Sequence, residues 1–183
     1  MSDHEDKGLK SHFERSSSRE RLLEHLFVGD LLRWLWQHGV HDVEVLRPEV
    51  DAGGYDLVIE CNGVLRHVQL KASTRKGKAA TQNINTRLAD KPSGCIVWMK
   101  FDPETMELGP FLWFGSPPGK RLPALGEKVA RRSTPNRDGV KPARANIRVL
   151  RKSKFKPLAT MSALAQEMFG LERTSRSRTP AAT

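Results

Sequence analysis

An acid, an amide and a lysine with complementary chemistry occur near one another in the sequence, at Asp56, Gln69 and Lys71. Carboxylate and amide oxygens are ligands that hard divalent cations such as Mg²⁺ accept. A lysine ammonium beside such a cation can orient or deprotonate a water molecule, or stabilise negative charge that develops in a transition state. The three side chains together would suit a metal-assisted hydrolysis, provided that the fold brings them to one place.

A β-hairpin is the element that we expect to position them. Residues 55–61 and 64–72 have the composition of strands, and the Asn62-Gly63 dipeptide between them is typical of a two-residue turn. A turn of that length fixes the register, because the residue before the dipeptide must face the residue after it.

In this register Asp56 lies directly opposite Gln69. Facing residues have Cβ atoms about 5 Å apart, and a diagonal neighbour, here Lys71, lies about 7–8 Å away. Alternation along each strand puts the acid, the amide and the lysine on one face of the sheet. The alternative is that they are only the solvated outer face of a hairpin.

The opposite face of the hairpin is predicted to belong to the core. It consists of apolar residues, interrupted only by Arg66 near the turn: Leu57, Ile59, Cys61, Val64, Val68 and Leu70. One buried face and one polar face specify the register strongly, because a slip by one residue would exchange them.

The segment Gly54-Tyr55-Asp56-Leu57-Val58-Ile59, followed by Gln69-Leu70-Lys71, resembles the catalytic hairpin of the PD-(D/E)XK nuclease superfamily. The form with Gln resembles that of modification-dependent restriction nucleases and of small bacterial homologues of intron-type endonucleases. The resemblance covers about residues 20–100. It implies a restriction-endonuclease-like core, which is an α/β (α+β) fold with a central mixed β-sheet flanked by helices.

The activity that the resemblance implies is metal-dependent endonuclease cleavage of phosphodiester bonds in nucleic acid, and we expect DNA as the substrate. The implied cofactor is Mg²⁺, with Mn²⁺ as an alternative. Asp56 and Gln69 would be metal ligands, and Lys71 would act on the attacking water or on the transition state. Many nucleases of this type act as dimers, so the resemblance also allows a homodimer.

The sequence departs from the family pattern at two points. No proline precedes Asp56, although Gly53-Gly54 provides a loop there, and Gln69 replaces the commoner acid. A neutral amide adds no charge to a metal site, so another carboxylate should compensate. Glu24, on the first predicted helix, is the first candidate for a catalytic and metal-binding role, and Asp30 is the second. The alternative for each is an acid at the helix edge that pairs with a nearby base.

Basic residues give the chain a net charge of +10 and a pI near 10, a balance that favours polyanions, chiefly nucleic acid. The loop after Lys71 contains the candidates for contacts with nucleic acid: Ser73, Arg75, Lys76 and Lys78. Further basic residues occur at 120–121, 128, 131–132 and 151–156, without an assigned target. A solvated charged loop is the alternative.

The remaining elements follow from hydrophobic periodicity. We expect helices at residues 19–38, 81–89 and 158–169, and strands at residues 43–47, 55–61, 64–72, 94–101, 108–114 and 145–150. Residues 115–142 are rich in Gly, Pro, Lys and Arg and suggest an extended basic region. The predicted organisation is a disordered lead at 1–18, a single nuclease-like domain at 19–170 and a disordered tail at 171–183.

The sequence also predicts the cellular compartment of the protein. The N-terminal residues lack the apolar middle of a signal peptide, and no apolar run approaches the ~18 residues that span a bilayer. The two cysteines, Cys61 and Cys95, lie in apolar runs without a CxxC pair, so we expect reduced, buried thiols. These features predict a cytoplasmic protein with no membrane partner.

Two other functions are compatible with the sequence. One is a nuclease-fold module that binds nucleic acid without cleaving it, which the amide at position 69 favours. The other is a basic adaptor protein with no nucleic-acid role.

Overall fold

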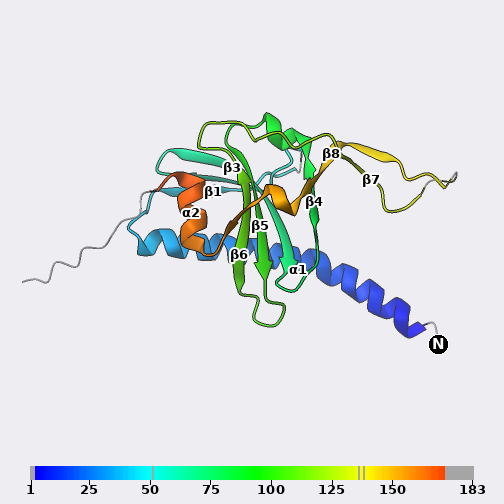
Figure 1. The fold of residues 1–183 in the computed structure, drawn as a ribbon. Coiled ribbons are helices and arrows are strands. Elements are labelled where there is room, and N and C mark those ends of the chain that lie inside the picture. The colour runs from blue at the N-terminus through cyan, green and yellow to red at the C-terminus, as the bar shows by residue number, and fades with distance from the viewer. Residues whose placement is uncertain (1–2, 51, 136, 138, 172–183) are drawn as a thin grey trace, which may run out of the picture.

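The computed structural model describes residues 3–50, 52–135, 137 and 139–171, with side chains from Ser16 onward (Figure 1). Its helices are α1 (Asp3–Gln37) and α2 (Met161–Phe169), with 3-10 turns η1 (Thr86–Asp90) and η2 (Lys152–Lys154). Its strands are β1 (Val43–Leu46), β2 (Leu57–Cys61), β3 (Val64–Thr74), β4 (Thr81–Asn85), β5 (Gly94–Phe101), β6 (Leu108–Gly115), β7 (Val129–Arg131), β8 (Ala143–Arg151) and β9 (Lys156–Leu158).

Six of these strands form a central mixed sheet in the order β1-β2-β3-β5-β6-β9. The β3 and β5 strands pair in parallel, and the other neighbours pair antiparallel. A second, three-stranded antiparallel sheet has the order β4-β8-β7. The predicted α+β class with a central mixed sheet is therefore confirmed, whereas the second sheet was not predicted.

The β2–β3 hairpin has the predicted turn and register. Asn62 and Gly63 have positive φ angles of 48° and 76°, as a type I′ turn requires. The pairs run from Cys61↔Val64 to Leu57↔Val68. This short turn thus sets which residues of β3 lie beside the start of β2.

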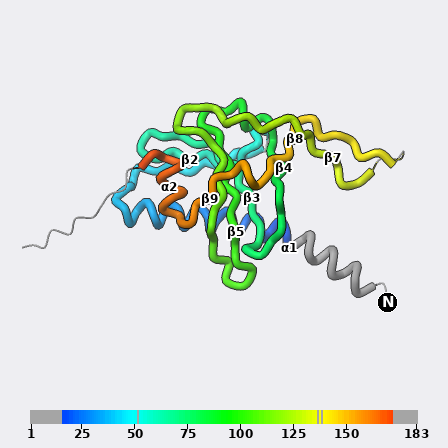
Figure 2. The backbone as a smooth tube through the Cα atoms, viewed as in Figure 1, coloured from blue at the N-terminus to red at the C-terminus, as the bar shows by residue number. Residues whose placement is uncertain are grey.

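The central sheet is covered on both faces, as Figures 1 and 2 show. On one face α1 contributes Leu23, Phe27, Leu31 and Leu35, all buried at the spacing of a single helix face, and α2 packs beside it. On the other face the second sheet packs through Ile84 and Leu150 against Ile96, Trp98, Leu112 and Phe114. The second sheet thus packs on β5 and β6. On the polar face of the hairpin Gln69 is buried, Lys71 is half-buried and Glu60 is exposed.

Arg66 interrupts the apolar face of the hairpin because it ties β3 to α2. Its side chain is fully buried, and its guanidinium donates hydrogen bonds to the carbonyls of Met168 (2.5 Å), Ser116 (2.9 Å) and Glu167 (3.4 Å). Two of these carbonyls belong to the last turn of α2, where a helix has orphan acceptors and negative dipole. Burial lowers the pKa of Arg66, which Cys95 and Glu167 partly oppose.

Strand lengths leave part of β3 without a neighbour on one side. The β2 strand pairs with β3 only as far as Val68, whereas β3 continues to Thr74 along β5. The edge of β3 beyond Val68 is therefore open on the side of β2. This opening is where the candidate site lies.

Two predicted elements were wrong. The first helix begins at Asp3 rather than Arg19, so residues 3–18, expected to be a disordered lead, are helical. The helix predicted over residues 81–89 is instead the β4 strand followed by the 3-10 turn η1. Pairing of β4 with the distant β8 overrides a local helical pattern that contains only two large apolar residues, Ile84 and Leu88. Of the predicted tail at 171–183, only Leu171 is described.

The cysteine prediction agrees with the structure, in which Cys61 and Cys95 are buried free thiols. Burial raises the pKa of Cys95 to about 12, against a small opposing effect of Arg66. Burial, with a contribution from Asp42, also raises the pKa of Cys61. Neither described helix contains an apolar stretch that would cross a bilayer.

Candidate active site

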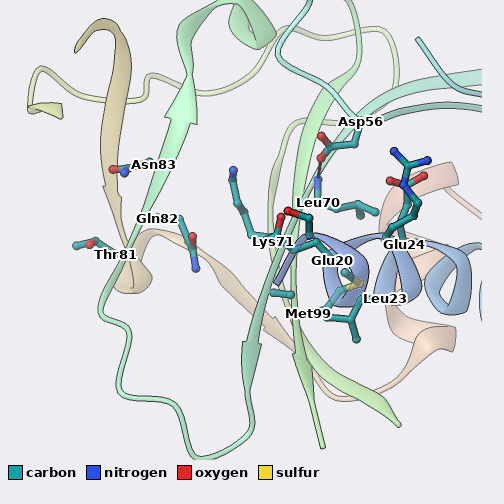
Figure 3. A pocket seen from close by; sticks show the side chains of 13 residues that line it. Glu20, Leu23, Glu24, Asp56, Leu70, Lys71, Thr81, Gln82, Asn83 and Met99 are labelled. Carbon is teal, nitrogen blue, oxygen red and sulfur yellow. Dashed lines mark hydrogen bonds between the residues drawn. The ribbon is translucent and has the colours of Figure 1, made fainter. Parts of the chain in front are cut away.

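A cavity of about 690 Å³ lies at the open edge of β3, between α1 and β4 (Figure 3). Its walls come from four elements and from the residue that precedes β2. The lining residues are Ser17, Glu20, Arg21, Leu23, Glu24, Asp56, Leu70, Lys71, Ala72, Thr81, Gln82, Asn83 and Met99. Three of the four residues predicted to be catalytic, namely Asp56, Lys71 and Glu24, line this cavity.

Asp56 is held by backbone groups on both sides of Gln69. Its N–H donates to the Val68 carbonyl (2.9 Å), and its Oδ2 accepts a hydrogen bond from the Leu70 N–H (2.6 Å). The expected proximity of Asp56 to position 69 is thus found. The Asp56 carboxylate also extends the hydrogen bonding of β3 past the end of β2. It accepts from the Leu70 N–H, a backbone donor that would otherwise have no strand neighbour on this side.

The glycine before Tyr55 shapes the approach to Asp56. Gly54 is buried with a φ of +72°, a conformation that residues with a Cβ rarely adopt. A Cβ at this position would lie 2.8 Å from the Cβ of Asn85. The loop can therefore pass close to the end of β4 and deliver Asp56 to the cavity only with glycine here.

Lys71 extends from β3 into the space between Asp56 and Gln82, as Figure 3 shows. In the parallel ladder Lys71 pairs with Trp98, a residue of the core on the side of the second sheet. Alternation therefore directs Lys71 toward that sheet, as it does Gln69, which pairs with Ile96. The predicted common face of Gln69 and Lys71 agrees with this register.

Gln69 does not line the cavity. Its side chain is only 7% exposed, and its Oε1 is buried without a hydrogen-bond partner among the described residues. A buried acceptor without a partner costs free energy, typically about 1–3 kcal/mol. Such an atom therefore indicates a strained site, or a ligand that would bind there.

Glu24 lines the cavity but its carboxylate is engaged. Its Oε1 accepts a hydrogen bond from Nε of Arg47 at 2.6 Å, and the pair is partly exposed. Asp30, the second candidate, pairs with Arg33 one turn later on α1 (3.1 Å) and does not line the cavity. The alternative considered for both acids, an ion pair with a nearby base, therefore describes their geometry.

Other polar residues of the cavity were not predicted from the sequence. Glu20 and Arg21 come from α1, and Gln82 and Asn83 come from β4. Glu20 lies four residues before Glu24, so helical periodicity would have placed the two acids on one face. No local pattern pointed to Gln82 and Asn83, because they reach the cavity through the pairing of β4 with β8.

The oxygen atoms around the cavity fit a hard divalent cation in chemical type. Asp56, Glu24 and Glu20 line the walls, and Gln69 next to Asp56 has an orphan oxygen. Within the described residues, no three His, Cys, Asp or Glu side chains form a group that could hold a metal ion. This arrangement is compatible with Mg²⁺, which keeps several of its waters and needs few protein ligands.

The basic residues of the loop after β3 differ in their contacts. Arg75 donates to the Gly109 carbonyl (3.0 Å) and pairs with Asp102 and Glu107, so its guanidinium is bound to the β5–β6 loop. Backbone donors from Glu104 and Thr105 lower the pKa of Asp102, and Arg75 adds to this effect. Lys76 and Lys78 are exposed.

Ser73 is also engaged, through its hydroxyl oxygen. This oxygen accepts hydrogen bonds from Nε1 of Trp98 and from Nζ of Lys100, both at 2.8 Å. Lys100 is 6% exposed, and burial, followed by the charge of Lys152, lowers its pKa. A second lysine is therefore held beside the β3 strand, two residue pairs beyond Lys71 and Trp98.

Comparison with solved structures shows a likeness to an endonuclease. The chain is similar to the bacterial homing endonuclease I-Ssp6803I, with 20% sequence identity and a TM-score of 0.28. The likeness covers 66% of this chain and 85% of that one. No protein-family model and no curated protein sequence matches the chain.

Proposed function

We propose that the protein is a Mg²⁺-dependent endonuclease of the PD-(D/E)XK type that hydrolyses phosphodiester bonds in DNA. The observation that carries the proposal is the cavity at the open edge of β3, which Asp56 and Lys71 line together. Their positions on the hairpin match the Asp and (E/Q)-x-K motif on which the sequence resemblance rests. A net charge of +10 supports a nucleic-acid substrate.

Asp56 and Gln69 would hold the cation, with Glu24 contributing directly or through water. Leu70 fixes the orientation of the Asp56 carboxylate through the 2.6 Å hydrogen bond to Oδ2. Glu24 would have to share its carboxylate with Arg47. A bound Mg²⁺ would supply charge neutralisation at the scissile phosphate and a water of lowered pKa.

Lys71 would act on the reacting groups. Its ammonium extends into the cavity and can orient the attacking water, accept its proton in the neutral form, or stabilise the negative charge that accumulates on the phosphate. Arg21, Gln82 and Asn83 line the same cavity and can position the substrate by hydrogen bonds to phosphate oxygens.

Cleavage of supercoiled plasmid tests the proposal. Wild-type protein would be compared with Asp56→Asn and Lys71→Met in the presence of Mg²⁺, Mn²⁺ or EDTA. We expect nicked and linear products with either metal and none in EDTA. Each substitution should lower the rate by about 10²-fold or more, the size expected when a group that stabilises the transition state is removed.

Asp90→Asn and Lys120→Met are matched controls, because both side chains are exposed and neither lines the cavity. Both variants should cleave at the wild-type rate. The proposal is wrong if the wild-type protein cleaves no form of DNA with either metal. Equal cleavage by wild type and Asp56→Asn would likewise assign the activity to another site or to a contaminant.

A nuclease-fold module that binds DNA without cleaving it is the second candidate. It is favoured by the engagement of Glu24 with Arg47 and by the neutral amide at position 69, because both reduce the negative charge that the cavity offers a cation. Salt-dependent DNA binding by a wild-type protein that cleaves nothing would support this function.

A further inference from the structure

The positive charge of the chain is concentrated in one segment. Residues 128–154 contain ten Lys or Arg and one acid, Asp138, whereas the whole chain has 31 Lys or Arg and 21 Asp or Glu. Most of this segment forms β7, β8 and the connection between them. The net charge of +10 therefore belongs largely to the second sheet rather than to the body of the molecule.

The outer part of this segment is a two-stranded ribbon. The β4 strand pairs with β8 only from Ile147 to Arg151, whereas β7 pairs with β8 farther out, through Ala130↔Arg144 and Arg131↔Ala143. Residues 143–146 of β8 are all exposed. In Figures 1 and 2 this ribbon projects away from the central sheet.

A two-stranded ribbon without an apolar core gains little stability from its own contacts. The register pairs each arginine with an apolar residue, as in Ala130↔Arg144 and Arg131↔Ala143, so the strands gain no cross-strand ion pair from these charges. Arg131 donates one long hydrogen bond within the ribbon, to the Lys141 carbonyl (3.4 Å). In the described part of the chain no acidic side chain forms an ion pair with Arg131, Arg132 or Arg144. The like charges gathered on the ribbon repel one another. An exposed and strongly basic ribbon fits a polyanionic partner, which would neutralise this repulsion.

The base of the ribbon is continuous with the candidate active site. Three arginines, Arg131, Arg132 and Arg144, line a surface hollow of about 580 Å³ together with Asn83 of β4. Asn83 also lines the cavity that contains Asp56 and Lys71. A ligand held along the ribbon would therefore pass directly to that cavity.

We propose that the β7–β8 ribbon docks in the major groove of duplex DNA, with Arg131 and Arg144 among the contacting residues. Strands in a ribbon lie about 4.8 Å apart, so a two-stranded ribbon with its side chains fits the groove of B-DNA, about 12 Å wide. The inference rests on the proposed function and extends it by naming the form of the substrate and the surface that recognises it. The deep, narrow major groove of duplex RNA would not admit the ribbon.

Equilibrium binding of a fluorescent DNA duplex in EDTA tests the ribbon without any cleavage. Arg131→Ala/Arg144→Ala would be compared with wild type across a series of salt concentrations. Each lost phosphate contact removes about 0.9 from the slope of log K against log salt. We expect the slope to fall by about 1–2 and the affinity by about 10-fold or more at low salt.

The control is Arg33→Ala/Lys120→Ala, which removes two exposed charges outside the ribbon. This variant changes net charge by the same amount and should retain nearly all of the wild-type slope. An Arg131→Lys/Arg144→Lys variant should also retain most of it, which separates charge from folding. Equal slopes for the ribbon variant and the control would overturn the inference.

Competition experiments test whether the ribbon binds duplex DNA through the major groove. Methyl green, a major-groove ligand, should displace the protein, whereas netropsin, a minor-groove ligand, should not. A duplex RNA of the same length should bind at least about 10-fold more weakly, because its major groove is too narrow for the ribbon. Displacement by netropsin alone, or equal affinity for duplex RNA, single-stranded DNA or an acidic peptide, would overturn groove docking.

These results are independent of catalysis. A protein that shows ribbon-dependent, methyl-green-sensitive DNA binding but no metal-dependent cleavage would retain this inference and lose the proposed activity. A protein that cleaves plasmid through Asp56 but binds DNA equally well without Arg131 and Arg144 would retain the activity and lose the inference.

Discussion

The Oδ2 atom of Asp56 lies 2.6 Å from the backbone nitrogen of Leu70 and accepts its hydrogen bond. The side chain thereby occupies the place of a strand neighbour, at the point where β2 ends and β3 continues. One carboxylate thus closes a β-ladder and faces a cavity. Its orientation is fixed by the backbone, which is the kind of preorganisation that a catalytic group requires.

Gln69 should report directly on cation binding. In EDTA, Gln69→Glu would bury an unpaired carboxylate and lower the melting temperature, whereas Gln69→Leu would remove the orphan oxygen and keep or raise it. With millimolar Mg²⁺, the deficit of Gln69→Glu should shrink, since ligand binding stabilises the folded state. Thermal denaturation with and without Mg²⁺ measures both effects, and an unchanged deficit would contradict a cation at this position.

Gly54→Ala should destabilise the protein by about 1–3 kcal/mol, because the new Cβ would meet Asn85 at 2.8 Å in a backbone conformation that favours glycine. It should also reduce plasmid cleavage, since this loop places Asp56. Gly29→Ala is the matched control: a Cβ there meets nothing within 4 Å on the exposed side of α1, so stability should rise by up to about 1 kcal/mol. Urea denaturation compares the two, and equal stabilities would contradict the prediction.

Arg66→Met should destabilise the fold strongly, because the carbonyls of Met168, Ser116 and Glu167 would lose their donor. A buried acceptor left without a partner costs about 1–3 kcal/mol. Arg66→Lys should lie between wild type and Met, since one ammonium cannot serve all three carbonyls. Arg33→Met, at an exposed position, should stay within about 0.5 kcal/mol of wild type in the same urea titrations.

Lys100 predicts a specific dependence of stability on pH. Burial, and then the charge of Lys152, lowers its native-state pKa below 10.5, so between these two pKa values the unfolded chain binds more protons. The stability of wild type relative to Lys100→Met should therefore rise as pH rises toward 10.5. Below the native-state pKa the penalty is complete and constant. Urea denaturation at about pH 7 and about pH 10 measures the difference, which Lys120→Met should not reproduce.

The hairpin could be predicted from the sequence because the information there is local. Asn62-Gly63 defines the turn, and alternation then assigns each residue to a face, so the pattern alone places Asp56, Gln69 and Lys71 together. Glu24 was placed near the site by helical periodicity together with the family resemblance. The ion pair of Glu24 with Arg47, 23 residues away, depends on how α1 packs against the sheet, so no local sequence pattern indicated it.

The second sheet was missed because its pairing is not local. The β4 strand contains one large apolar residue, Ile84, and becomes a strand only through pairing with β8. No sequence pattern therefore predicted that Gln82 and Asn83 would line the cavity. The beginning of α1 at Asp3 was also missed, because the residues before Arg19 lack an apolar stripe that would indicate a helix.

The uneven distribution of charge makes the molecule an electric dipole. Outside residues 128–154 the numbers of acidic and basic residues nearly balance, so the positive pole lies at the β7–β8 ribbon. In the field of a polyanion such a molecule experiences a torque as well as an attraction. The protein would approach the polyanion with the ribbon in front, so that a larger share of encounters would lead to binding. Added salt screens this long-range attraction and would slow association before it weakened any direct contact.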